Sequence, residues 1–351
     1  MLIEEHKLLG PFTTLGIGGP ARWFIEARTE DDVAEASEWA SKHPMRLFVL
    51  GGGSNLVVAD AGFDGLAIHI GLRGIRCEAQ DAFGLRTYRV AAGEDWDGFV
   101  ERAVREGCAG IECLAGIPGT VGGTPVQNVG AYGQEVSSTI ERVRAFDLDE
   151  RRFVEFAGDE CGFAYRRSRF NSTERGRYVV TRVDYQLAPG GAPSLRYADV
   201  QRSFAEKENP TLAEVAAAVR RIRQAKGMLL VDGDPDCRSA GSFFKNPVVS
   251  EEQVRHIAER GAKEPPRFPA GADAGSADRV KVPAAWLIEQ SGFAKGYRQG
   301  SAGISSRHTL ALINRGGATA TEILTLAEKI KGVVRDRFGI TLEMEPVLLG
   351  F

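Results

Sequence analysis

A glycine-rich run over residues 110–133 constrains the fold of this chain more than any other segment. Its sequence is GIECLAGIPGTVGGTPVQNVGAYG, and Glu112 is its one charged residue. The glycines and Pro118 exclude a long helix, and the scarcity of charge indicates a surface that is buried or covered by a ligand. Tightly turned backbone with exposed N–H groups suits a phosphate-bearing cofactor. Taken alone, the run is equally consistent with a demanding turn in a large α/β enzyme.

A second glycine loop lies upstream, in the segment VLGGGSNLVV at residues 49–58. Three consecutive glycines between two apolar strands let the backbone approach a pyrophosphate, and Ser54 and Asn55 can add hydrogen bonds. The loop is not a Walker loop, because no Lys-Ser/Thr pair follows the glycines. It is not a Rossmann fingerprint, because Leu56 stands where the last glycine belongs and a strand follows. Two such loops favour a fold that holds FAD between two small α+β subdomains.

Charge and cysteine content exclude several classes of protein. The net charge of −3 argues against a nucleic-acid surface, and the basic run Arg220–Arg223 is interpreted as structural, because cations are favoured at a helix end. The five cysteines show no Cys-x-x-Cys spacing, which favours a reducing compartment over disulfides or zinc. The first ten residues lack signal-peptide features, and no apolar run approaches the roughly 20 residues that span a bilayer. We expect a cytoplasmic monomer without membrane, nucleic-acid or obligate protein partners.

The hydrophobic pattern predicts alternating strands and helices, followed by an antiparallel sheet. Strands are expected at 21–27, 46–50, 56–59, 66–70, 88–92, 143–148, 152–156, 178–187 and 342–349, and helices at 31–42 and 96–105. Three capping boxes predict further helix starts, at Thr211/Glu214, Ser250/Gln253 and Thr319/Glu322. The Pro-, Gly- and Ala-rich segment 261–277 is predicted to be a mobile surface loop.

Chemically distinctive residues also occur outside the glycine loops. The run AGSFFKNP at 240–247 holds Ser242 on constrained backbone, without the Gly-x-Ser-x-Gly pattern of a hydrolase elbow, and taken alone it favours a structural role for Ser242 over a catalytic one. The run YRRSRF at 165–170 suits a carboxylate or phosphate clamp, or equally a solvated turn. Glu343 and Glu345 flank Met344 and would share one face of a strand. The five histidines form no triad and no metal spacing, so no metal is expected.

Five motifs in this order resemble the UDP-N-acetylenolpyruvoylglucosamine reductase family: VLGGGSNLVV, GIPGTVGGTPVQNVGAYG, YRRSRF, AGSFFKNP and PAAWLIEQSG. The resemblance implies an α+β fold of the vanillyl-alcohol-oxidase/PCMH type. It implies two FAD-binding subdomains, at 1–73 (joined by the strand 341–351) and 74–208, and a substrate domain at 209–340. The implied activity is that of a UDP-N-acetylmuramate dehydrogenase. This FAD enzyme uses NADPH to reduce the enolpyruvyl group of a UDP-sugar to a lactyl ether for peptidoglycan.

The same resemblance implies roles for individual residues. Ser242 is implied as the proton donor after hydride transfer from flavin N5, with Arg166 and Glu345 as the other catalytic residues. The choice of Glu345 over Glu343 rests on register. FAD-binding positions are Gly51, Gly52, Gly53, Ser54, Asn55, Gly116, Ile117, Pro118, Gly119, Thr120, Val121, Gly122, Gly123, Gln127 and Tyr132. Substrate-contacting positions are Tyr197, Lys226, Asn246 and Gln290. Tyr197 indicates the branch of the family that has a substrate-loop tyrosine.

Two alternatives compete with this reductase. One is a flavin oxidase of the same fold that acts on an alcohol with oxygen as oxidant. The other is a non-catalytic nucleotide-binding protein that kept the flavin loops. Ser242, Arg166 and Glu345 argue against both, because neither alternative needs a proton donor opposite N5.

Overall fold

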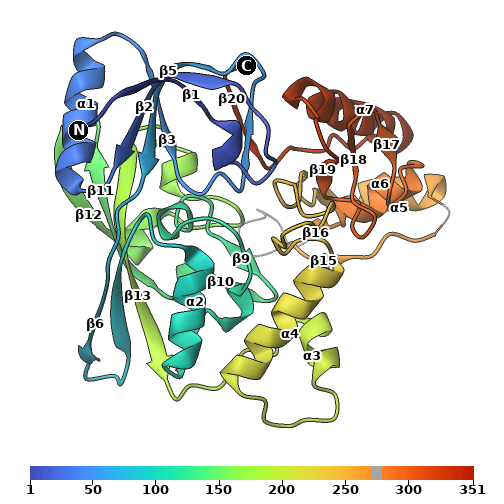
Figure 1. The fold of residues 1–351 in the computed structure, drawn as a ribbon. Helices are drawn as coiled ribbons and strands as arrows, with labels where there is room; N and C mark the ends of the chain where they lie inside the picture. Colours follow the sequence, from blue (N-terminus) through green and yellow to red (C-terminus); the bar gives the residue numbers. More distant parts are fainter. Residues whose placement is uncertain (262, 271–278) are drawn as a thin grey trace. The chain divides into compact units, whose positions relative to one another are not determined.

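The computed structural model describes residues 1–261, 263–270 and 279–351 (Figure 1). The chain forms two compact units, and each contains segments that are distant in the sequence. Unit 1 comprises Met1–Lys7, Ala21–Gly52 and Asp64–Gln224, and unit 2 comprises Leu8–Pro20, Gly53–Phe63 and Ala225–Phe351. The boundary therefore divides the first glycine loop after Gly52.

Unit 1 is built on two main sheets and a short ladder of β9 (Gly130–Ala131) with β10 (Gln134–Glu135). The smaller sheet has the order β1 (Glu4–Leu8), β2 (Pro20–Ala27), β5 (Phe63–Ile70) and β3 (Arg46–Leu50), with β3 parallel to β5. The larger sheet has the order β12 (Arg152–Ala157), β11 (Ile140–Asp147), β13 (Tyr178–Pro189), β7 (Arg86–Ala91) and β6 (Ile75–Gln80), and β8 (Cys108–Ala109) also pairs with β13. The long alternating strand β13 pairs antiparallel with β11 and β7, as its pattern predicts. The helices are α1 (Glu30–Lys42), α2 (Trp96–Arg105), α3 (Ala198–Ser203) and α4 (Leu212–Ala225).

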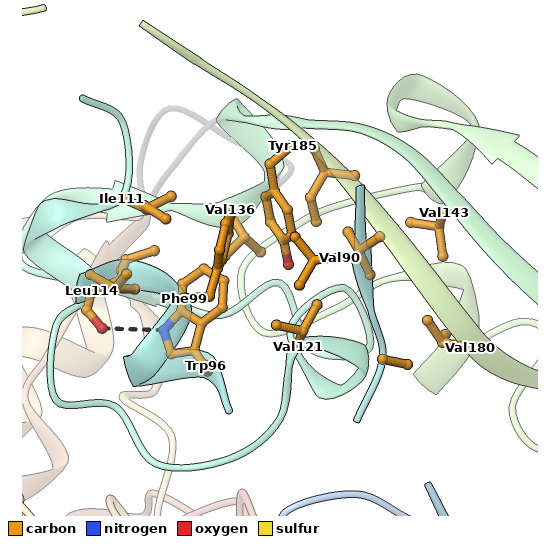
Figure 2. Close-up of a cluster of buried hydrophobic side chains, with 14 of the residues drawn as sticks. Val90, Trp96, Phe99, Ile111, Leu114, Val121, Val136, Val143, Val180 and Tyr185 are labelled. Carbon is orange, nitrogen blue, oxygen red and sulfur yellow. Dashed lines mark hydrogen bonds between the residues drawn. The ribbon is translucent and has the colours of Figure 1, made fainter. Parts of the chain in front are cut away.

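The core of unit 1 holds both halves of the glycine-rich run (Figure 2). Trp96 and Phe99 of α2 pack against Tyr185 of β13, with ring centroids 5.8 and 5.1 Å from the tyrosine. The Trp96 indole donates a hydrogen bond to the Leu114 carbonyl at 3.2 Å. The Tyr185 hydroxyl lies 2.6 Å from the Thr124 hydroxyl. The run itself forms no long helix, as its glycines predict; it contains the short 3-10 turns Glu112–Leu114 and Val121–Gly123 and the two-residue strand β9 (Gly130–Ala131).

Within its described residues, unit 2 packs three helices beside short strands. The helices are α5 (Glu251–Arg260), α6 (Ala284–Gln290) and α7 (Ala320–Phe338). One ladder of strands has the order β14 (Val248–Ser250), β16 (Arg279–Lys281) and β15 (Phe268–Pro269). Another has the order β17 (Arg298–Gln299), β18 (Ala302–Ile304) and β19 (Leu312–Asn314). The C-terminal strand β20 (Val347–Leu349) pairs parallel with β4 (Leu56–Val58). α7 buries Ile323, Leu326, Ile330 and Val334, a helical spacing that explains why it lies on the core.

The three predicted capping boxes are confirmed. Ser250 and Thr319 each accept a hydrogen bond from the backbone three residues on, and Thr211 does the same for Glu214. The strand expected at 342–349 was too long, because only Val347–Leu349 is a strand. Pro346 has no N–H to donate to a ladder, so it separates residues 342–345 from the strand β20. The loop predicted at 261–277 falls in part on residues 262 and 271–277, outside the described residues, and its described part includes β15.

Candidate active site

The two glycine loops meet within unit 1. A Cβ added at Gly52 would lie 2.5 Å from the Gly119 Cα, and one at Gly51 would lie 2.9 Å from the Thr120 Oγ1. Such distances are shorter than a carbon atom tolerates, so both positions need the absence of a side chain. Loops that the sequence identifies separately as phosphate-binding are therefore neighbours. Glycine-only backbone of this kind is what a dinucleotide such as FAD requires, and the residues fit that cofactor.

The unit 2 half of the first loop lies beside Glu345. Gly53 has a φ of 59°, and a Cβ there would lie 1.8 Å from the Phe12 carbonyl oxygen. The Asn55 amide donates to the Glu345 carbonyl at 3.3 Å, and the Val347 N–H donates to the Asn55 carbonyl at 2.9 Å. These bonds extend the β4–β20 pairing and hold the loop against the segment that carries the predicted glutamate.

The second glycine loop is anchored to the start of α2. The Gly116 N–H donates to Asp97 Oδ1 at 2.6 Å, and the Gly116 carbonyl accepts from Arg223 Nε at 2.9 Å. The Gly119 carbonyl accepts from the Trp96 N–H at 3.1 Å. Gly116 and Gly119 have φ values of 73° and 126°, which favour glycine. Residues outside the loop therefore fix its backbone.

Glu112, the single charge of the run, is completely buried. Its carboxylate accepts hydrogen bonds from the Gly110 N–H at 2.8 Å, the Gln134 side chain at 2.8 Å and the Ser194 N–H at 2.7 Å. A buried carboxylate is tolerated only when it is hydrogen-bonded in this way. Glu112 therefore joins the glycine run to the segment that leads to Tyr197. The sequence showed the charge but not this role.

Arg166 sits in a tight turn that is tied to the same run. Ala164 and Arg167 pair across the turn, and Arg166 has a φ of 56°. Its Nη2 donates to the Gly130 carbonyl at 2.8 Å. The buried Asn128 side chain donates to the Ala164 carbonyl at 3.1 Å. The structure thus brings Arg166 next to the segment that contains Gln127 and Tyr132.

Tyr132 and Tyr197 also lie together in unit 1. Their rings meet edge to face, with centroids 5.3 Å apart and an interplanar angle of 88°. Tyr132 is buried, whereas Tyr197 is 42% exposed. A Cβ at Gly133 would lie 3.2 Å from the Arg196 side chain, so the backbones are close as well.

Ser242 and Glu345 are joined by backbone pairing in unit 2. Phe244 pairs antiparallel with Met344. The Glu345 N–H donates to the Phe243 carbonyl at 3.0 Å, and the Lys245 N–H donates to the Glu343 carbonyl at 2.9 Å. Ser242 directly precedes Phe243, so this pairing places the backbone of Ser242 near that of Glu345.

The surroundings of the two glutamates differ. Glu343 has a side chain that is 71% exposed and forms an ion pair with Lys245 at 2.5 Å. Glu345 is only partly accessible and lies beside the glycine-loop residue Asn55. An exposed, paired carboxylate suits a solvated surface position, so the geometry favours Glu345 as the site residue.

The charges of Lys226 and Lys295 both act on His308, and the sequence patterns singled out neither Lys295 nor His308. Three segments converge on the buried Ser305. Its carbonyl accepts from the Gly296 N–H at 3.0 Å, its hydroxyl accepts from the His308 N–H at 3.4 Å, and a Cβ at Gly227 would lie 3.1 Å from that hydroxyl. Spacings along the chain cannot show this convergence, because the residues come from separate segments.

The protonation state of His308 follows from its surroundings. Burial lowers the pKa of His308 to about 4, and the ammonium groups of Lys226 and Lys295 contribute to the same shift. The Leu310 N–H donates to His308 Nδ1 at 3.1 Å. The neutral ring therefore carries its proton on Nε2. Two ammonium groups and one N–H donor gathered in this way suit an anion.

Asn246 and Gln290 lie at opposite ends of α6. Asn246 Oδ1 accepts a hydrogen bond from the Ala284 N–H at 2.9 Å, at the first residue of the helix. Gln290 is the last residue of this seven-residue helix, which at the usual helical rise is about 9 Å long. The bond to Ala284 fixes the Asn246 amide group, with Oδ1 facing the helix.

The described residues contain neither a metal-binding cluster nor a helix suited to cross a membrane. Over 1–261, 263–270 and 279–351, no group of three or more His, Cys, Asp or Glu side chains is arranged to hold a metal ion. In the same part of the chain, none of the helices is long and apolar enough to cross a membrane.

Comparisons with known proteins give consistent results. A family model described as FAD binding domain matches residues 21–152, and one described as UDP-N-acetylenolpyruvoylglucosamine reductase, C-terminal domain, matches residues 234–349. The chain is 46% identical over 352 residues to the UDP-N-acetylenolpyruvoylglucosamine reductase of Streptomyces coelicolor, covering 97% of this chain and 89% of that protein. It is 38% identical over 364 residues to that of Mycobacterium leprae, covering 99% and 95%.

A solved structure gives the same result. The UDP-N-acetylenolpyruvylglucosamine reductase (MurB) of Thermus caldophilus matches with a TM-score of 0.68 and 28% identity, over 99% of both chains. These findings confirm the predicted α+β, FAD-binding fold and the FAD cofactor, with NADPH as reductant. The chain belongs to the UDP-N-acetylenolpyruvoylglucosamine reductase family, whose members are FAD-dependent oxidoreductases of peptidoglycan precursor synthesis.

Proposed function

We propose that Ser242, Arg166 and Glu345 carry out the chemistry of this reductase. The reaction converts UDP-N-acetylglucosamine-enolpyruvate to UDP-N-acetylmuramate. The observation that carries the proposal is the pairing of Phe243 with Glu345, which joins the proton donor and the glutamate through one backbone ladder. FAD, when bound at the glycine loops, supplies the hydride from N5 to the terminal vinyl carbon.

The residues act on the electron pair that hydride addition leaves behind. This pair lies on the carbon that bears the carboxylate, where it is delocalised as an enolate. Arg166, fixed by its bond to the Gly130 carbonyl, stabilises the developing negative charge. Glu345, when it is protonated, donates a hydrogen bond to the same carboxylate. Ser242 then donates its hydroxyl proton to the carbanion, which completes the lactyl ether, and general acid catalysis of this kind contributes about 10²–10⁴-fold.

The diphosphate of the UDP-sugar is proposed to bind at Lys226, Lys295 and His308. The two ammonium groups supply charge, and the neutral imidazole donates from Nε2. Asn246, with Oδ1 committed to α6, presents its Nδ2 group as a further donor. Tyr197, a residue that is 42% exposed, is proposed to contact the substrate as well. Gln290 stays a prediction from the family resemblance alone.

The FAD contacts and the three-subdomain division also stay proposals. FAD-binding residues are proposed in both glycine loops, where the approach of Gly52 to Gly119 supports them. We further propose a cytoplasmic monomer. The free thiols of all five cysteines suit a reducing compartment.

The two half-reactions test the catalytic assignment separately. In anaerobic stopped-flow measurements, NADPH should bleach the flavin absorbance, and the enolpyruvyl substrate should restore it. Ser242→Ala should keep the first step and slow the second by about 10²–10⁴-fold, because only the second needs the proton donor. Glu345→Gln should also slow the second step, whereas Glu343→Gln is the matched control and should leave both steps unchanged.

Two results would contradict these assignments. A Ser242→Ala enzyme that reduces the substrate at the wild-type rate excludes Ser242 as the proton donor. Reoxidation by oxygen with indifference to the UDP-sugar would indicate an oxidase. If Glu343→Gln and Glu345→Gln exchange their expected effects, the register is shifted by two residues.

A further inference from the structure

Arg223 is a buried cation at the last turn of α4. The residue is 9% exposed, and its Nε donates to the Gly116 carbonyl at 2.9 Å. The guanidinium also hydrogen-bonds the Tyr132 side chain. Burial lowers the pKa of Arg223, while Tyr132 and Asp97 oppose that shift. Since a buried charge is costly without such partners, these contacts determine where the guanidinium lies. The sequence pattern had suggested only a helix-end cation.

Both the N–H and the carbonyl of Gly116 form hydrogen bonds with side chains. Its N–H donates to Asp97 Oδ1 at 2.6 Å, and its carbonyl accepts from Arg223. Asp97 Oδ2 in turn accepts from Arg220 Nη1 at 2.5 Å. The first turn of α2, through Asp97, and the C-terminal half of α4, through Arg220 and Arg223, therefore share one polar network around Gly116.

The other contact of Arg223 leads to the substrate-side tyrosines. Tyr132 has a φ of 49° and is buried, so its ring has little freedom. It packs edge to face on Tyr197, with ring centroids 5.3 Å apart. Arg223 thus touches the cofactor loop through Gly116 and a tyrosine pair through Tyr132. All of these residues belong to unit 1.

We propose that Arg223 is a positioning residue that couples the FAD loop to the Tyr132–Tyr197 pair. It fixes the Gly116 carbonyl and the Tyr132 hydroxyl at the same time, so order in the cofactor loop is transmitted to the ring that supports Tyr197. The inference rests on the proposed function for the assignment of Gly116 to FAD and Tyr197 to substrate.

Full-length variants of Arg223 test this coupling. Arg223→Met keeps the length of the side chain and removes both hydrogen bonds. It should weaken FAD binding by about 10- to 100-fold, as expected for the loss of a charged hydrogen bond. FAD affinity is measured by flavin fluorescence during reconstitution of the apoprotein. The KM for the enolpyruvyl substrate should rise as well. Arg223→Lys should recover part of both losses, and Arg221→Met, at an exposed neighbour, is the matched control.

A purely structural role gives a different result. In that case Arg223→Met would lower the Tm of the apoprotein and of the FAD-bound protein equally, with FAD affinity and substrate KM unchanged, and the proposal would be wrong. The coupling predicts instead that FAD raises the Tm of the variant less than that of the wild type. It also predicts that Arg223→Met and Tyr132→Phe have non-additive effects on substrate KM, whereas additive effects would overturn it.

Measurements on the wild-type protein distinguish a failure of this proposal from a failure of the proposed function. If the wild-type protein binds no FAD, both fail. If it binds FAD and reduces the substrate while Arg223→Met behaves identically, only the positioning role fails.

Discussion

At the scale of single residues, Gly52 determines how closely the two glycine loops approach. A Cβ there would lie 2.5 Å from the Gly119 Cα, and the obstructing atom is backbone rather than a movable side chain. Gly53 is constrained in a second way, by its φ of 59°. These loops could be predicted from the sequence because their constraints act on single residues. Close backbone approach and a positive φ both require glycine.

Gly52→Ala should therefore lower the Tm of the apoprotein and weaken FAD binding. Overpacking costs about 1–3 kcal/mol, which corresponds to roughly a tenfold or larger loss of affinity if the loops separate. The measurements are thermal unfolding without cofactor and an FAD titration. Gly123→Ala is the control for stability, because a Cβ at Gly123 meets nothing within 4 Å. Wild-type Tm and affinity in Gly52→Ala would show that the loops do not need this close approach.

Other residues could not be found from local chemistry. The capping boxes were predictable because Ser250 and Thr319 bond backbone three residues away. The charges of Lys226 and Lys295 act on His308 only because their segments converge on Ser305. Sequence spacing carries no information on that convergence.

At the scale of elements, Glu112 joins the glycine run to the segment before Tyr197. The pattern of the run showed a nearly uncharged stretch, and the structure shows that its one carboxylate is the acceptor for three donors.

The strand predicted at 342–349 was too long because its residues pair with two different segments. Residues 343–345 pair with 243–245, and Pro346 then interrupts the strand before β20. Alternating polarity cannot tell which partner a segment will choose.

Glu112→Gln should destabilise unit 1 and raise the KM for the UDP-sugar. The amide NH₂ cannot accept, so at least one buried donor loses its partner, at a cost of about 1–3 kcal/mol. Substrate binding suffers because Ser194, which leads to Tyr197, loses its anchor. FAD affinity should change less. Thermal unfolding and steady-state kinetics measure these effects, and Asp159→Asn on the surface is a control. An unchanged KM with a lower Tm would restrict Glu112 to a stabilising role.

At the scale of the whole molecule, two partly buried histidines make stability depend on pH. Burial together with Lys226 and Lys295 lowers the pKa of His308 from 6.5 to about 4, and burial also lowers the pKa of His69. Between pH 6.5 and about 4, His308 binds a proton in the unfolded chain but not in the folded protein. The free energy of unfolding therefore falls as the pH falls from 6.5 to about 4, and it is fully retained above that window.

The His308 contribution to this loss is at most about 3 kcal/mol. His308→Gln should flatten the dependence of Tm on pH within the window, while His43→Gln, at an exposed position, should not. UDP should have a similar effect on the wild type, because a diphosphate beside Lys226, Lys295 and His308 favours the imidazolium and raises its pKa. A wild-type pH dependence in His308→Gln would show that other groups control acid sensitivity. If UDP leaves the His308 titration unchanged by NMR, the diphosphate binds elsewhere.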